Sequence, residues 1–286
     1  MSQFDLPMTA VADLVARALA EDIPWGDVTS ENLIPVAQQG VGRIEARQNG
    51  ILAGLPVARA VFAQVDPGLE FEPRLSDGMT LQPGQIVATL RGSLRTLLRG
   101  ERVALNLLQR LSGIATVTDR YVKAVDGYPA HIIDTRKTTP GLRLLERYAV
   151  RVGGGHNHRF CLSDAVLIKD NHLAALRSRG VDLPTAISDL RQTIPHTVTI
   201  EVEAETLADV AEALAARVNA ILLDNMPPEL LADAVRLIDH RAISEASGGI
   251  TLDTVRAVAA TGVDLISVGA LTHSVRSLDL SLEIEV

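Results

Sequence analysis

The sequence has little that would connect it with a membrane, with nucleic acid or with an oxidising compartment. Cys161 is the only cysteine in 286 residues, so no intrachain disulfide can form. No apolar run approaches the roughly 20 residues that a membrane-spanning helix needs, and the first residues lack the layout of a secretory signal. A net charge of -8 disfavours general binding to nucleic acid or to membrane surfaces. We therefore expect a cytoplasmic protein with neither kind of partner.

Aromatic residues are also scarce, at 3% of the chain, although 47% of the residues are hydrophobic. The core must therefore consist mainly of Ala, Val, Leu and Ile, as is common where strands and helices alternate in layers. This composition favours an α/β fold over an aromatic-rich β-sandwich.

The first part of the chain has two kinds of pattern. Residues 8–23 carry apolar side chains at helical spacing, whereas residues 41–90 show short runs broken by Asn-Gly, Asp-Gly and Pro-Gly turns. A long helix is predicted over residues 95–125, with Arg102 on one stripe and an apolar stripe on another. We expect a small α+β sandwich followed by a helix that bridges to the second part.

From His131 onward, short apolar strands alternate with helical segments. The predicted strands are HIIDTRKT, AVLIKD, VTIEVE, AILLDN, AISEASGG and DLISVGA. Six βα units in series predict a parallel sheet, whose strand ends are the usual place for chemistry in such folds. The tail 274–286 alternates like a strand and is predicted to return to the first domain.

The residues between Arg136 and Lys169 reverse the charge of this acidic chain, with seven Lys or Arg against two acids. Such a run is often a solvated basic face. Its position at strand ends, beside the GGGHNHR sequence, favours instead a site for a multiply anionic ligand. The glycines permit close approach to a ligand or form a plain turn. His156 and His158 fit ligand binding or a structural role better than zinc.

Acidic and small residues follow the later strands. Glu203 and Asp224 end successive strands, so the two carboxylates are expected at one edge of the sheet, where they suit Mg²⁺ or ribose hydroxyls. Each is alternatively a cap for the next helix, and Glu201 competes with Glu203 for the role. The turns at Ser247 and Val268 offer main-chain N–H groups to a phosphate.

Nine segments, in this order and spacing, resemble those of the quinolinate phosphoribosyltransferase family, also called nicotinate-nucleotide pyrophosphorylase (carboxylating). They are EDIPWGDVTS, RLSGIAT, DTRKTTPGLR, GGGHNHR, LIKDNH, EVE, LLDN, SGGI and SVGALTHS. The resemblance implies an N-terminal α/β sandwich over residues 1–115, completed by the tail 274–286, and an incomplete α/β barrel over residues 116–273. It also implies a homodimer, or a higher oligomer, in which one subunit helps to complete its neighbour's site.

The resemblance also implies a role for each candidate residue. Those implied to bind the quinolinate carboxylates are Arg102, Arg136, His158 and Arg159, with Arg102 acting in the partner subunit's site. Lys137 and Lys169 share this basic pocket as catalytic residues near the reacting groups. Glu203 and Asp224, also catalytic, face the ribose and Mg²⁺-pyrophosphate, and Ser247, Gly248 and Gly269 form the 5′-phosphate turns.

The implied reaction makes the chain a pentosyltransferase of de novo NAD biosynthesis. Quinolinate and phosphoribosyl pyrophosphate give nicotinate mononucleotide, CO₂ and pyrophosphate with Mg²⁺ and no organic cofactor, because the quaternised ring nitrogen accepts the electrons of decarboxylation. One alternative is the paralogue found with molybdate-transport systems, which acts on another acceptor. Another is a carrier module, because GMTLQPGQIVATLRG resembles a lipoyl or biotinyl hairpin; no Lys occurs between Met1 and Tyr121 to be modified.

Overall fold

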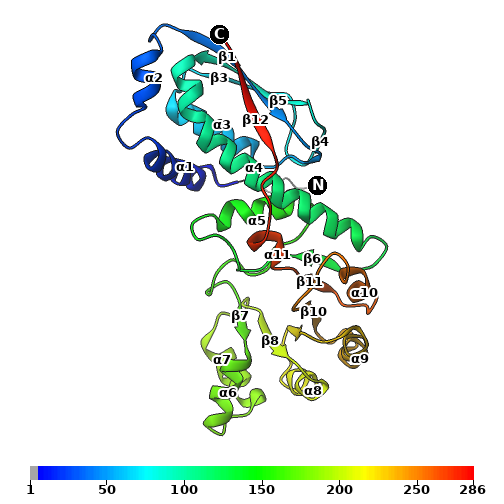
Figure 1. Ribbon diagram of the computed structural model, residues 1–286. Helices are drawn as coiled ribbons and strands as arrows, with labels where there is room; N and C mark the ends of the chain where they lie inside the picture. Colours follow the sequence, from blue (N-terminus) through cyan, green and yellow to red (C-terminus); the bar gives the residue numbers. More distant parts are fainter. Residues whose placement is uncertain (1–5) are drawn as a thin grey trace. The chain divides into compact units, whose positions relative to one another are not determined.

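The chain folds into two compact units, here called the first and the second unit (Figure 1). The structure is a computed structural model that describes residues 6–286. The first unit contains the residues up to 119 together with 138–154 and 271–286, and the second unit contains 120–137 and 155–270. Within residues 6–286, none of the helices combines the length and apolar character that crossing a membrane requires.

The first unit contains a four-stranded antiparallel sheet in the order β12-β1-β5-β3. The strands are β1 (Gln39–Ala46), β3 (Glu70–Pro73), β5 (Ile86–Ser93) and β12 (Leu280–Glu285). Strands β2 (Gly50–Ile51) and β4 (Thr80–Leu81) form a separate pair. Because β12 pairs with β1 along its whole length, the C-terminal tail is an edge strand of this sheet.

The first unit also contains five longer helices. They are α1 (Met8–Asp22), α2 (Val28–Leu33), α3 (Leu55–Val65), α4 (Leu94–Ala124) and α5 (Arg143–Val152). Leu97 of α4 packs on Gly40 and Gly42 of β1. The helices predicted at residues 8–23 and 95–125 are confirmed, and the apolar stripe of α4 is buried.

Helix α3 lies inside the segment for which the sequence analysis expected only strands. Pro56 stands in its first turn, and its buried Val57, Val61 and Phe62 recur at helical spacing. Phe62 packs against Phe71 at 6.2 Å between ring centroids, and a Cβ on Gly100 of α4 would lie 2.6 Å from the Phe62 ring. The Phe62 ring therefore packs directly on the α4 backbone at Gly100, where a Cβ would force the ring to shift.

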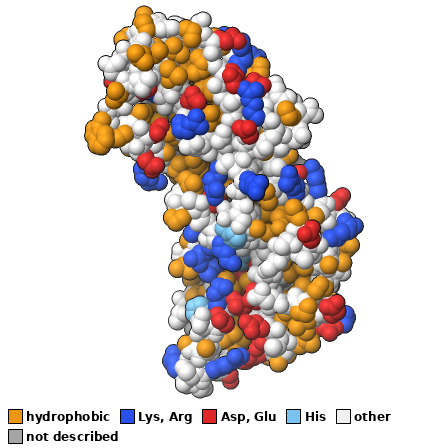
Figure 2. Space-filling model, viewed as in Figure 1, with side chains coloured by type: hydrophobic (Ala, Val, Ile, Leu, Met, Phe, Trp, Pro, Cys, Tyr) orange, Lys and Arg blue, Asp and Glu red, His pale blue; other side chains and the backbone are white. Residues whose placement is uncertain are grey.

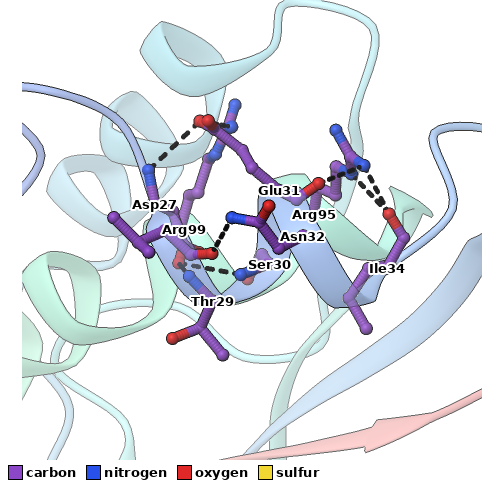
Figure 3. A network of polar contacts seen from close by, with 9 residues as sticks. Asp27, Thr29, Ser30, Glu31, Asn32, Ile34, Arg95 and Arg99 are labelled. Atoms are coloured by element: carbon purple, nitrogen blue, oxygen red, sulfur yellow. Dashed lines mark hydrogen bonds and ion pairs between the residues drawn. The ribbon is translucent and has the colours of Figure 1, made fainter.

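Helix α2 is fixed at both ends by polar contacts (Figure 3). The Asp27 carboxylate accepts hydrogen bonds from the backbone N–H groups of Thr29 and Ser30, which caps the helix N-terminus. Near its C-terminus, Nε of Arg95 donates to the Ile34 carbonyl at 2.8 Å. Since Arg95 belongs to α4, helix α2, in which the EDIPWGDVTS segment ends, is bound at its C-terminus to the long helix.

The second unit contains six parallel strands in the order β6-β11-β10-β9-β8-β7. They are β6 (His131–Ile133), β7 (Val166–Ile168), β8 (Ile200–Ala204), β9 (Ala220–Asp224), β10 (Ile243–Ser247) and β11 (Leu265–Ser267). All six predicted strands are confirmed. The sheet does not close, because its edge strands β6 and β7 do not pair with each other, so the expected incomplete barrel is also confirmed.

The helices of the second unit follow the strands in the manner of βα units. They are α6 (Asp170–Ser178), α7 (Leu183–Thr193), α8 (Leu207–Ala215), α9 (Pro228–Ile238) and α10 (Val255–Ala259), and α11 (Ala270–His273) begins at the last residue of the unit. Since the strands are parallel, all six C-terminal ends lie at one edge of the sheet, here called the C-terminal edge.

Candidate functional site

The C-terminal edge of the second unit carries ten of the eleven predicted site residues. From β6 to β11 these are Arg136, Lys137, His158, Arg159, Lys169, Glu203, Asp224, Ser247, Gly248 and Gly269. Arg102 is the exception, because it lies on α4 in the first unit. The Arg102 side chain is 59% exposed. Within the described residues its one ion pair is with the adjacent Glu101, at 3.3 Å between Nη2 of Arg102 and Oε1 of Glu101.

A buried aspartate fixes the loop that contains the histidines. Asp134 follows β6 and has no exposed surface. Its carboxylate accepts hydrogen bonds from Nδ2 of Asn157 at 2.6 Å and from the backbone N–H of His158 at 2.9 Å. His156 forms a bridge to Ile133 along the free edge of β6. The loop therefore runs beside β6, which directs His158 and Arg159 to the C-terminal edge.

Two guanidinium groups lie close to each other in this region. Burial lowers the pKa of Arg159, and the neighbouring charge of Arg136 lowers it further. Arg159 is anchored by a 2.8 Å hydrogen bond from its Nη1 to the Ala165 carbonyl, just before β7. Figure 2 shows Lys, Arg and His side chains beside a group of acidic side chains on the visible face of the second unit. Cations held together in this way favour a ligand with more than one negative charge.

The two histidines of the loop have different surroundings. The exposed His156 ring lies 4.6 Å from the His131 ring. The His158 ring points instead toward the sheet, with Nε2 at 3.2 Å from Oε2 of Glu201 and 3.6 Å from Oε2 of Glu245. The ligand atoms of these three side chains lie within 4.8 Å of one another, whereas His156 belongs to no such group in residues 6–286.

The surroundings of His158 fix the position of its proton. Nδ1 accepts a hydrogen bond from the backbone N–H of Arg159 at 2.6 Å, so the ring proton lies on Nε2 and is donated to Glu201. Burial lowers the pKa of His158, but the hydrogen bond to Glu201 and the charge of Glu245 outweigh it, and the pKa is raised overall. Burial and the charge of Glu201 raise the pKa of Glu245 to about 8. The two carboxylates therefore disfavour the simultaneous ionisation of Glu201 and Glu245, and both favour the protonated His158 ring.

A second acidic group lies nearer the strand ends. Carboxylate oxygens of Glu203, Glu205 and Asp224 lie within 4.8 Å of one another. Nζ of Lys169 donates to Oε2 of Glu203 at 2.9 Å, and Nδ2 of Asn225 donates to Oδ2 of Asp224 at 2.6 Å. The expectation that Glu203 and Asp224 share one edge agrees with this geometry. Glu201, which competed with Glu203 in the sequence, belongs to the His158 group instead.

The turn after β10 packs tightly against the end of β9. The backbone N–H of Asn225 donates to the Ser247 carbonyl at 2.9 Å. Gly248 has φ +95°, and a Cβ at this position would lie 2.1 Å from Oδ1 of Asn225. Only glycine is compatible with this turn. The next helix, α10, begins at Val255, whereas α11 begins directly after Gly269.

Sequence reasoning missed two of the residues that surround His158. Glu245 lies within the predicted strand AISEASGG but received no role, and Glu201 was considered only as a rival of Glu203. Strand alternation puts Glu201 and Glu203 on the same face of β8 and is a usable signal. No sequence pattern, however, indicates that β8 and β10 both contribute a carboxylate to a histidine from a distant loop.

Comparisons with known proteins cover nearly the whole chain. Residues 27–112 match the family model described as quinolinate phosphoribosyl transferase, N-terminal domain, and residues 114–283 match that of the C-terminal domain. The chain is 47% identical over 281 residues to a probable nicotinate-nucleotide pyrophosphorylase (carboxylating) of Synechocystis, covering 97% of this chain and 94% of the relative.

Two further relatives extend this similarity. A nicotinate-nucleotide pyrophosphorylase (carboxylating) of Mycobacterium leprae is 44% identical over 286 residues, with 98% of this chain and 99% of the relative covered. The crystal structure of NadC from Streptococcus pyogenes superposes with a TM-score of 0.93 at 43% identity, covering 98% of each chain. The likeness therefore includes both units and their folds.

Proposed function

The chain belongs to the quinolinate phosphoribosyltransferase family, and from this membership we propose that it joins quinolinate to phosphoribosyl pyrophosphate. The products are nicotinate mononucleotide, CO₂ and pyrophosphate, as in de novo NAD biosynthesis. Relatives named for this activity are 40–47% identical over nearly the full length. The enzyme is a pentosyltransferase.

One observation carries the proposal beyond family membership. A cationic group with Arg136 and Arg159 and an acidic group with Glu203 and Asp224 occupy the same C-terminal edge of the parallel sheet. The cationic group suits the two carboxylates of a dicarboxylate, and the acidic group suits a ribose with a metal-bound pyrophosphate. One part of the C-terminal edge is therefore suited to each substrate.

We assign the pyridine dicarboxylate to the cationic group. Arg136 and Arg159 present forked donors that match carboxylates, and His158 lies directly beside Arg159. Lys137 and Lys169 are exposed at the same edge and supply further positive charge near the reacting atoms. Lys169 forms an ion pair with Glu203, so it connects the cationic group with the acidic group.

We assign the phosphoribosyl group to the acidic and glycine-containing half. The carboxylates of Glu203, Glu205 and Asp224 are hard oxygen donors close enough to hold one Mg²⁺, so these residues fit the metal. When bound there with the substrate phosphates, Mg²⁺ would stabilise the negative charge of the departing pyrophosphate. Ser247, Gly248 and Gly269 would receive the 5′-phosphate, because their turns bring backbone close to the ligand without obstructing side chains.

The reaction requires positioning more than acid or base catalysis. The quinolinate nitrogen forms a bond to C1 of the ribose as the bond from C1 to pyrophosphate breaks. The nitrogen then carries a positive charge, which accepts the electron pair left when the adjacent carboxylate departs as CO₂, and a proton replaces that carboxylate on the ring. No organic cofactor is needed as an electron sink. The Arg and Lys side chains orient the two substrates and exclude water.

We also propose a cytoplasmic homodimer in which Arg102 acts in the partner subunit's site. The exposure of Arg102 supports this role, since its guanidinium is accessible on α4. The test mixes an Arg102→Ala variant with a Lys137→Ala variant under conditions that exchange subunits. A shared site in a two-fold dimer predicts recovery of about a quarter of wild-type activity, because half of the dimers are hybrids and each hybrid has one intact site. If each variant is inactive alone and mixing gives no recovery, Arg102 acts in the site of its own subunit; if Arg102→Ala is active alone, Arg102 belongs to no site.

The proposed reaction is tested with the purified full chain. Quinolinate, phosphoribosyl pyrophosphate and Mg²⁺ should give nicotinate mononucleotide and an equal amount of CO₂, and EDTA should stop the reaction until Mg²⁺ is restored. Nicotinate in place of quinolinate is the control acceptor. Failure to form nicotinate mononucleotide from quinolinate would refute the proposal.

A further inference from the structure

The two carboxylates beside His158 are buried. Glu201 is 8% exposed and Glu245 is 1% exposed, although both belong to strands of the barrel interior, where Leu or Val would pack at lower cost. Glu201 belongs to β8 and Glu245 to β10, on either side of β9. Two strands thus place carboxylates at a single imidazole.

These carboxylates are separate from the acidic group assigned to Mg²⁺. That group contains Glu203, Glu205 and Asp224, and neither Glu201 nor Glu245 belongs to it. Glu201 lies one alternation earlier on β8 than Glu203 and is therefore deeper below the C-terminal edge. It contacts the imidazole that adjoins the cationic group, not the metal-binding oxygens.

The contacts form a continuous path from the barrel interior to Arg159. Glu201 accepts the proton of His158 Nε2, and His158 Nδ1 accepts the backbone N–H of Arg159. On the opposite side, Asp134 accepts the backbone N–H of His158. The loop is thereby held through both its backbone and its ring, so moving the ring would displace the Arg159 backbone.

We propose that Glu201 and Glu245 are positioning residues that hold the His158 ring and, through it, orient Arg159 toward the carboxylates of the pyridine substrate. The inference rests on the proposed function, because it names quinolinate as the ligand whose binding is controlled. It concerns one substrate only. The phosphoribosyl half of the site has its own carboxylates and glycine turn.

The test compares substitutions of Glu201 in the full-length enzyme. Glu201→Leu removes the acceptor of the Nε2 proton, and Glu201→Asp keeps the charge but withdraws the carboxylate by one methylene. Because a hydrogen bond between a charged and a polar group contributes strongly in a buried site, both variants should raise KM for quinolinate roughly tenfold to hundredfold. KM for phosphoribosyl pyrophosphate, measured at saturating quinolinate, should stay within about twofold of the wild type, since its binding half is untouched.

Two further variants separate positioning from general effects. Glu201→Gln retains an acceptor oxygen at the same reach and should recover most of the quinolinate affinity. Glu212→Gln is the matched control, since Glu212 lies on α8 in the same unit and pairs with Arg177 away from the site. It should leave both KM values at the wild-type level.

The outcomes distinguish this inference from the proposed function. A wild-type enzyme that does not use quinolinate would refute the proposed function itself. An active wild type, with Leu and Asp variants that raise both KM values alike or neither, would overturn only the positioning role. If Glu201→Leu does not fold, the Asp variant still decides the question. A metal ion found by elemental analysis of the wild type and lost from Glu201→Leu and Glu245→Gln would also overturn the inference, because the three side chains would then be ligands.

Discussion

The buried ion pair between Arg110 and Glu146 provides the most direct test of what holds the first unit together. Glu146 on α5 has no exposed surface, and Arg110 on α4 has a side chain 26% exposed. Oε1 of Glu146 accepts from Nε and Nη2 of Arg110 at 2.8 and 2.6 Å, and Oε2 accepts the backbone N–H of Thr139 at 3.1 Å. Nη2 of Arg110 also donates to the Thr272 carbonyl at 2.9 Å. This pair therefore joins three segments that are distant in sequence, at residues 110, 139–146 and 272.

Removing one partner should cost far more than removing both. Glu146→Ala leaves a largely buried guanidinium without its anion and an amide without its acceptor, so the free energy of unfolding should fall by about 3–5 kcal/mol. The double variant Arg110→Met with Glu146→Leu removes both charges and fills the space. It leaves only neutral groups of Thr139 and Thr272 unpaired, so the loss should be smaller, about 1–2 kcal/mol.

The assay is urea unfolding followed by far-UV circular dichroism at constant pH, with the m-value monitored for a change of mechanism. Asp233→Ala is the control, since the Arg236–Asp233 pair on α9 is exposed, and its removal should cost less than about 1 kcal/mol. If Glu146→Ala is no more destabilising than this control, or if the double variant is less stable than Glu146→Ala, the reasoning is refuted.

Three further predictions concern the second unit. Native Glu245 keeps its proton up to about pH 8, whereas an ordinary glutamate has a pKa of 4.5, so the wild type should lose stability as pH rises through this interval. Glu245→Gln cannot ionise, and its melting temperature relative to wild type should rise between about pH 5 and about pH 8 and then level off; a constant difference would contradict this pKa. Lys137→Ala should abolish turnover while the melting temperature is retained, and near-normal turnover would exclude Lys137 from catalysis. Gly248→Ala should weaken phosphoribosyl pyrophosphate binding at least tenfold by calorimetry, because the added Cβ meets Asn225 in a left-handed turn; unchanged binding would remove this turn from the phosphate site.

Local patterns were sufficient to predict most of the fold. The number of parallel strands follows from six short apolar runs that end in polar residues and alternate with helical segments, because runs of this length suit a buried strand. Helix α3 was missed although its sequence contains a helical apolar face, since turn signals on both sides favoured strands.

The sequence by itself also determined which residue types stand at the strand ends, and its motifs were sufficient to identify the family. It did not separate Glu201 from Glu203, because both lie on the same face of β8 and a period of two treats them alike. The tertiary structure assigned one to His158 and the other to Lys169 and Asp224. The partners of a buried charge are chosen by packing between segments distant in sequence, as with Arg110 and Glu146, and no local pattern records that choice.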